Sequence, residues 1–205
     1  PATPFAPAPI EEVTAKIRET RPDVVFAPHV ETSAGLILPD DYVTAMAAAA
    51  HEVGALMVLD GIASGFAWID MRATGVDVLI SAPQKGWSAS PSAGLVMLSE
   101  RALVRLEGTV SDSFALDLKK WRAIMKAYED GGHAYHATMP TDALRAFRDT
   151  MIETRDYGFE KLREAQWELG DGVRKMLRDL EVSPRARFFN CSRGKVVTFH
   201  AFSRK

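Results

Sequence analysis

The chain has 205 residues, a formal net charge of −2 and a single cysteine. Its 25 basic residues are scattered along the sequence, which argues against a nucleic-acid footprint or a polybasic membrane patch and favours a small-molecule partner. One cysteine excludes an internal disulfide and a cysteine-based metal site. Because no apolar stretch approaches the roughly 20 residues of a membrane helix, we expect a soluble, cytoplasmic protein.

Helical and strand patterns alternate over the first 110 residues. The helical patterns, with apolar spacing or an acidic start and an alanine-rich body, cover 10–18, 40–51 and 100–106. The apolar runs typical of strands cover 23–27, 55–59, 76–84 and 94–98, and the first is predicted to be a buried strand. This alternation predicts an α/β fold with a mostly parallel sheet and flanking helices.

The pattern changes after about residue 110. Long amphipathic stretches at 116–128, 141–155 and 159–180 follow one another without strands, and only 195–202 returns to a strand pattern. We therefore expect residues 1–110 to be part of a large α/β domain, and residues 111–205 to be an interdomain segment with an incomplete α+β domain. The start at Pro1 and the unclosed last strand predict that the chain is the middle portion of a longer protein.

Two polar residues follow neighbouring apolar runs. Asp60 follows the run 55–59, and Lys85 follows the run 76–84. Ligands bind at the carboxyl ends of parallel strands, so both side chains are expected at one edge of the sheet. The turn after Lys85 is rich in Gly, Ser and Pro, and we expect little water there, which favours a neutral, nucleophilic amine. Taken alone, however, a lysine after a strand more often points at solvent.

A carboxylate and an amine at one sheet edge suit one cofactor in particular. Pyridoxal phosphate requires a carboxylate that pairs with its pyridinium nitrogen and a lysine that condenses with its aldehyde. Asp60 and Lys85 are the candidates for these two tasks.

Four spaced segments extend the pattern along nearly the whole chain. They are His29-Val-Glu-Thr-Ser-Ala-Gly35, Asp60-Gly-Ile-Ala-Ser64, Ser81-Ala-Pro-Gln-Lys85 and Tyr135-His-Ala-Thr-Met-Pro140. With them the chain resembles the class V aminotransferases, within the fold-type I pyridoxal phosphate enzymes. The likeness is strongest to the alanine-glyoxylate and serine-glyoxylate aminotransferases.

The resemblance implies catalytic and cofactor-binding roles for five residues. Lys85 would form the Schiff base and then move a proton at the substrate α-carbon, and Asp60 would keep the pyridine nitrogen protonated. Ile62 would pack on the ring, which is compatible with ordinary core burial. Thr32 would bond the phenolic oxygen, although it could also be a turn residue. Gln84 would donate to the phosphate.

Two further residues imply an assembly. Tyr135 and Thr138 match the pair that, in this family, reaches the phosphate of the neighbouring subunit, so the resemblance implies a homodimer. Without the family, this segment would pass as an ordinary loop.

The implied activity is transfer of an amino group from a small amino acid, alanine or serine, to a 2-oxo acid such as glyoxylate. A lyase or racemase of the same fold would use Lys85 and Asp60 equally well. A truncated, non-catalytic relative is the other alternative, because the family's phosphate loop and substrate-carboxylate arginine fall outside these residues. A cysteine desulfurase is disfavoured, since Gln84 replaces the usual His and Cys191 has no adjacent base.

Two further patterns have plainer explanations. His133 and His136 lack further ligands at metal spacing, so no metal is expected. The four tryptophans lie far apart in the sequence and are predicted to be core or interface residues, not a stacking platform.

Overall fold

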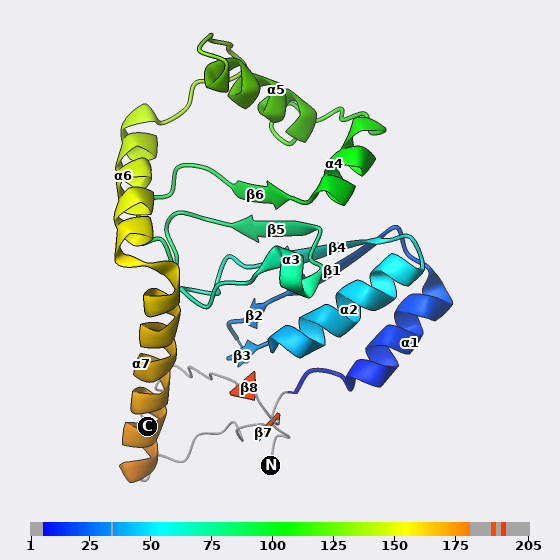
Figure 1. Ribbon diagram of the computed structural model, residues 1–205, viewed down its shortest axis with the longest axis vertical. Coiled ribbons are helices and arrows are strands. Elements are labelled where there is room, and N and C mark those ends of the chain that lie inside the picture. The colour runs from blue at the N-terminus through cyan, green and yellow to red at the C-terminus, as the bar shows by residue number, and fades with distance from the viewer. Residues whose placement is uncertain (1–5, 34, 181–189, 192–193, 196–205) are drawn as a thin grey trace.

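The computed structural model describes residues 6–33, 35–180, 190–191 and 194–195. In this part of the chain, four strands form one sheet in the order β1-β4-β5-β6 (Figure 1). They are β1 (Val24–Pro28), β4 (Leu56–Asp60), β5 (Val78–Ser81) and β6 (Leu95–Leu98). The first three are parallel, and β6 runs antiparallel to β5. The predicted fold, a mostly parallel sheet with flanking helices, is confirmed.

Two helices lie on one face of the sheet: the second packs on the strands through small side chains, and the first packs against the second. They are α1 (Ile10–Thr20) and α2 (Asp40–Glu52). Met57 and Leu59 of β4 are 0% exposed, and each contributes about 1.5–3 kcal/mol by leaving water. They share a buried cluster with the inner face of α2, formed by Val43, Met46, Ala47 and Ala50. The alanines bring the helix backbone close to the strands, which closes this core.

The opposite face of the sheet is more open. Side chains alternate along a strand, so Val58 and Asp60 point away from the face that carries Met57 and Leu59. Phe26 pairs in register with Val58 and is 59% exposed. The prediction of a buried strand at 23–27 is thus wrong for one face, because the described helices that pack on β1 and β4 cover the other. Asp60 lies on this open face.

A buried carboxylate ties the sheet to its flanking elements. Asp77, which is 2% exposed, accepts hydrogen bonds from Met57 N at 2.9 Å, His51 Nε2 at 2.8 Å and Ser99 Oγ at 3.1 Å. These donors belong to β4, to α2 and to the cap of the helix that follows β6. The Asp77 side chain therefore holds these three elements together.

Short elements connect and flank the sheet. They are β2 (Val30–Glu31), β3 (Leu36–Ile37), α3 (Met71–Thr74) and α4 (Glu100–Glu107). β2 and β3 pair as an antiparallel hairpin, which the sequence does not predict. The hairpin lies beside the carboxyl ends of β1 and β4 (Figure 1).

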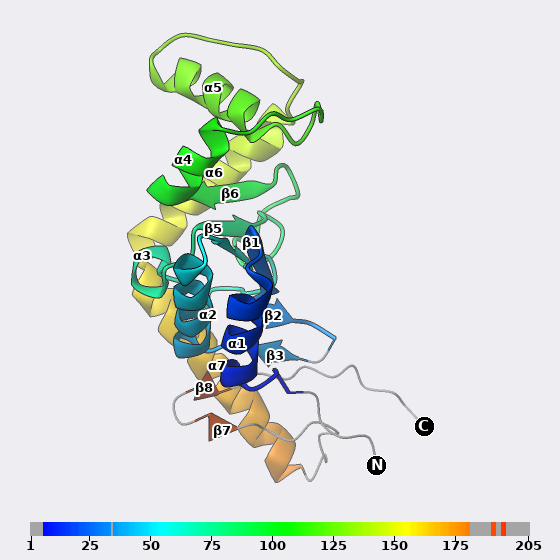
Figure 2. The ribbon, with the colours of Figure 1, turned by 90° about the vertical axis from the view of Figure 1, so that its right-hand side faces the viewer.

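The second half of the chain is helical, as predicted. Its helices are α5 (Leu118–Glu129), α6 (Thr141–Tyr157) and α7 (Phe159–Asp179). α6 and α7 follow one another along the side of the molecule at which β5 ends (Figures 1 and 2), and Gly158, with φ +108°, breaks the helix between them. In the ranges that the structure describes, none of the helices has the length and apolar character to cross a membrane.

Two short strands close the described chain. β7 (Asn190–Cys191) pairs with β8 (Gly194–Lys195). Beyond Lys195, the predicted strand at 195–202 lies outside the described residues. The expected division near residue 110 stays a prediction.

Candidate active site

The ends of β4 and β5 bring the two central candidates to one edge. Asp60 is the last residue of β4 and pairs in register with Ile80 of β5. The turn that carries Lys85 starts after Ser81. Neighbouring strands lie about 4.8 Å apart, so the Asp60 end and the Lys85 turn are adjacent. The predicted shared edge is confirmed.

A cavity of about 450 Å³ lies at this edge. Four segments line it: the β2–β3 hairpin, the loop after β4, the Lys85 turn and α7. Thr32, Ser64 and Lys85 contribute hydroxyl and amine groups, and Trp167 of α7 contributes an aromatic wall. We take this cavity as the candidate active site because it combines a nucleophile with hydrogen-bonding groups in one concave space.

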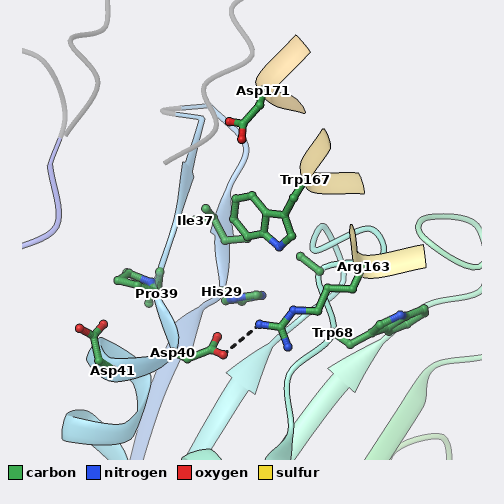
Figure 3. A pocket seen from close by; sticks show the side chains of 11 residues that line it. His29, Ile37, Pro39, Asp40, Asp41, Trp68, Arg163, Trp167 and Asp171 are labelled. Carbon is green, nitrogen blue, oxygen red and sulfur yellow. Dashed lines mark hydrogen bonds and ion pairs between the residues drawn. The ribbon is translucent and has the colours of Figure 1, made fainter. Parts of the chain in front are cut away.

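A second cavity, of about 530 Å³, lies next to the first. Figure 3 shows its lining, in which the His29 ring and the Arg163 side chain lie between Asp40 and Trp167. Arg163 Nη2 donates to Asp40 Oδ2 at 3.0 Å. Lys85 is not among the described residues that line this larger space, so the amine chemistry belongs to the smaller one.

Lys85 is exposed in the structure, as is Gln84 beside it. The expectation of a water-poor environment for Lys85 is therefore wrong for the described chain. The reason is geometric: the side chain leaves a turn beyond the end of β5 and lines an open cavity, whereas Ala82 and Pro83 before it are buried.

The Asp60 carboxylate is fixed by its own loop. Its Oδ1 accepts a hydrogen bond from Ile62 N at 2.9 Å, and both residues are partly buried. Neither Asp60, Ile62 nor Gln84 is among the described residues that line the smaller cavity. Of the five expected local residues, the structure thus brings Thr32 and Lys85 into one cavity and leaves the other three in segments adjoining it.

Tyr135 and Thr138 lie elsewhere. Tyr135 Oη and Thr138 Oγ1 share a hydrogen bond of 2.9 Å in the segment between α5 and α6. Tyr135 is 74% exposed, and neither residue is among those described as lining the cavity beside Lys85. Their side chains are therefore presented to solvent by this chain.

Two glycines press the loop after β4 against the Lys85 turn. A Cβ atom on Gly86 would lie 2.3 Å from the carbonyl oxygen of Gly65, so no larger residue fits without a shift of the backbone. The sequence marks both positions only as parts of Gly-rich turns. The contact fixes the position of the turn from which Lys85 projects.

An aromatic cluster supports the same turn. The rings of Trp68 and Trp87 are 5.0 Å apart, and Phe159 of α7 and Phe147 of α6 pack edge-on against them. The sequence separation of the tryptophans is thus misleading for this pair, although the expected packing role holds. The cluster anchors the Lys85 turn to both long helices.

His29 is a buried polar residue beside the candidate site. It is 2% exposed, and its Nδ1 forms a hydrogen bond of 2.7 Å with Ser64 Oγ. Burial lowers the pKa of His29 to about 4, against the opposing influence of Asp40 and the Leu38 backbone. His29 and Ser64 both fall within the quoted sequence segments, but the sequence assigned neither a role.

His136 also has a protein partner. Its Nε2 bonds the carbonyl oxygen of Phe114 at 2.8 Å, and its ring packs on Trp121. Across the described ranges, no group of three His, Cys, Asp or Glu side chains is arranged to hold a metal ion.

The groups at this edge fit pyridoxal phosphate. The cofactor needs an amine for its aldehyde and a carboxylate for its pyridine nitrogen, and Lys85 and Asp60 offer these groups at the ends of adjacent strands. Thr32 and Ser64 add hydroxyl groups around a cavity of about 450 Å³. This donor set matches the chemistry that the cofactor requires.

Comparison with known proteins agrees with this geometry. The family model for class V aminotransferases matches residues 6–201. A 2-aminoethylphosphonate–pyruvate transaminase of Burkholderia mallei is 32% identical over 97% of this chain and 53% of its own length. An alanine–glyoxylate aminotransferase of Oryctolagus cuniculus is 29% identical over 83% of this chain and 43% of its own.

A comparison with solved structures agrees on the fold. The crystal structure of an alanine–glyoxylate aminotransferase from Nostoc sp. has a TM-score of 0.77 at 24% identity, over 88% of this chain and 47% of that one. The chain spans about half the length of the curated relatives it matches. On the family match and the relative at 32% identity, the chain belongs to the class V aminotransferases, a family of pyridoxal-phosphate-dependent enzymes.

Proposed function

We propose that the whole protein is a transaminase that moves an amino group from a small amino acid to a 2-oxo acid. The observation that carries the proposal is the pairing of Asp60 with the strand that leads to Lys85, beside a cavity lined by Lys85 and Thr32. Alanine or serine is the proposed donor and glyoxylate the proposed acceptor. The relatives at 29–32% identity are named for glyoxylate or pyruvate as acceptor.

The chemistry is proposed to rest on two residues. Lys85 would hold the cofactor through its amine and would take and return a proton at the substrate α-carbon. Asp60, which the Ile62 amide orients, would keep a proton on the pyridine nitrogen. When bound, pyridoxal phosphate supplies the electron-accepting ring.

The remaining local residues orient the cofactor. Thr32 would donate its hydroxyl to the phenolic oxygen, Ile62 would pack against one ring face, and Gln84 would donate to the phosphate. The exposure of Gln84 and the position of Thr32 in the cavity wall support these assignments.

Tyr135 and Thr138 are proposed to serve the neighbouring subunit of a homodimer. Their mutual hydrogen bond holds two hydroxyl groups together on an exposed segment away from the cavity of their own chain. That arrangement suits a phosphate offered by a second copy.

Borohydride trapping tests the cofactor assignment. The chain is mixed with pyridoxal phosphate, reduced and digested, and the modified peptide is identified by mass spectrometry. We expect a visible absorption band that the reduction abolishes and a single modified site at Lys85. Lys85→Ala should abolish both signals, whereas Lys120→Ala, a matched exposed lysine on α5, should leave them unchanged. Modification spread evenly over exposed lysines would contradict the assignment.

A product balance on the whole protein tests the reaction. With L-alanine and glyoxylate, a transaminase forms one pyruvate for each glycine and needs both substrates. A lyase would consume its amino acid without an acceptor, and a racemase would form D-alanine. Either of these outcomes, in place of the balanced pair, would replace the proposed reaction with the alternative.

A further inference from the structure

His29 occupies a fixed position at the end of β1. Its amide donates to the carbonyl oxygen of Asp60 at 2.8 Å, and its own carbonyl oxygen accepts from Leu38 N at 2.8 Å. The residue is 2% exposed. The backbone of His29 is therefore fixed from two sides, one of them the strand that ends at Asp60.

The ring in turn holds Ser64. The distance between His29 Nδ1 and Ser64 Oγ is 2.7 Å, which is a short, well-formed hydrogen bond. Ser64 lines the cavity that Lys85 also lines, whereas His29 lines the neighbouring one. The bond thus passes through the wall between the two cavities. A hydroxyl group at this wall has a defined orientation only while its histidine partner is present.

Ser64 leads directly to the Lys85 turn. The next residue, Gly65, has the carbonyl oxygen that a Cβ on Gly86 would meet at 2.3 Å. At the start of the same loop, the Ile62 amide orients the Asp60 carboxylate. The loop at 61–65 therefore connects both proposed cofactor-binding groups, and His29 is its anchor from the side.

We propose that His29 is a positioning residue: through Ser64 it fixes the loop that sets the Asp60 carboxylate and the Lys85 turn relative to each other. The inference rests on the proposed function in assigning those two groups to the cofactor. Burial keeps the imidazole uncharged near neutral pH, so the bond to Ser64 does not switch with pH in that range.

Three variants of the full chain test the proposal. Ser64→Ala removes the hydroxyl group, His29→Phe removes the ring nitrogen, and His29→Asn places a side-chain amide near the position of Nδ1. We expect Ser64→Ala and His29→Phe each to weaken pyridoxal phosphate binding about tenfold, as loss of one hydrogen bond does. The double variant should bind no more weakly than either single variant. His29→Asn should recover most of the affinity, a rescue that a simple packing role would not give.

Amide hydrogen exchange without cofactor gives an independent readout. Ser64→Ala and His29→Phe should speed exchange in residues 61–67 and 85–88, while α2 keeps its protection. Unchanged exchange in these segments, or an equal increase across the chain, would overturn the proposal. So would additive losses in the double variant. Failure of the proposed function has a different result: the unaltered chain would give no borohydride-trapped adduct at Lys85. In that case the hydrogen-exchange result would still decide the role of His29.

Discussion

At the scale of single residues, the site depends on a neutral histidine and on two backbones that touch. His29 is buried with a pKa of about 4, well below the ordinary value of 6.5, and burial is the main cause. Gly86 leaves no space for a side chain against Gly65. Both features act on the loop and turn that carry the proposed cofactor-binding groups, and each makes a distinct prediction.

The buried His29 predicts that the stability of the protein depends on pH. Unfolded His29 takes up a proton near pH 6.5, whereas folded His29 does so near pH 4, so the unfolded chain binds more protons between these values. The contribution of His29 to stability is therefore fully present above about pH 6.5 and is lost as the pH falls toward 4, by at most about 3 kcal/mol. Urea unfolding across this range should show a steeper loss for the unaltered chain than for His29→Asn. Equal slopes would contradict the assignment of the shift to His29.

The close contact at Gly86 predicts that a larger side chain there impairs cofactor trapping. Gly86→Ala should move the Lys85 turn, because the added methyl group would overlap the Gly65 carbonyl, and pyridoxal phosphate trapping at Lys85 should fall at least tenfold, a change equal to about 1.4 kcal/mol. Gly94→Ala is the matched control, since its Cβ would meet nothing within 4 Å. Trapping that is equally efficient in the two variants would show that the turn tolerates the displacement.

At the scale of elements, the sequence predicts the helices and strands that have a repeating pattern of apolar and polar residues. The helix at 40–51 has an acidic start and an alanine-rich body, and α2 is observed at Asp40–Glu52. The β2–β3 hairpin has two residues in each strand, too few to show an alternation, and the sequence gives no sign of it. The exposure of Lys85 was also missed, because a run of apolar residues predicts a strand but not what covers the turn after it.

Some residues of the candidate site could also be placed from local sequence patterns, and others could not. Asp60 and Lys85 could be placed from the strand ends alone, since β4 and β5 proved to be neighbours. Tyr135 and Thr138 came only from the family resemblance. Trp167 enters the cavity from α7, a helix that no local pattern links to the sheet edge.

Substitution of Asp77 tests whether its hydrogen bonds hold these elements together. Because it accepts hydrogen bonds from β4, α2 and Ser99 while buried, Asp77→Ala should lower the free energy of unfolding by about 3–5 kcal/mol. Urea unfolding measures the change. Asp112→Ala, at an exposed position, should change it by less than about 0.5 kcal/mol. A loss for Asp77→Ala no larger than that of the control would mean that the three elements are held together by apolar packing alone.

At the scale of the whole molecule, the candidate site is open on the side of the sheet that carries Asp60. Val24 and Phe26 are 49% and 59% exposed on that face, and the proposed phosphate ligands Tyr135 and Thr138 are presented away from the cavity. The exposed position of this hydroxyl pair supports the proposed homodimer.

Mixed dimers test that assembly in the whole protein. One subunit carries Lys85→Ala and its partner carries Tyr135→Phe with Thr138→Val. If Tyr135 and Thr138 serve the other subunit, the intact Lys85 receives an intact hydroxyl pair, and the mixed dimer should bind pyridoxal phosphate at one site with unaltered affinity. If they serve their own subunit, no intact site exists and the affinity should match that of the Tyr135→Phe, Thr138→Val dimer.

The contact between Gly65 and Gly86 also limits how this scaffold can be altered. A loop and a turn that touch through bare backbone cannot be lengthened or given larger side chains independently, so insertions there would displace Lys85. Changes to the shape of the cavity should instead begin at Val30 and Ile37 of the hairpin or at Trp167 of the long helix, which line it from other segments.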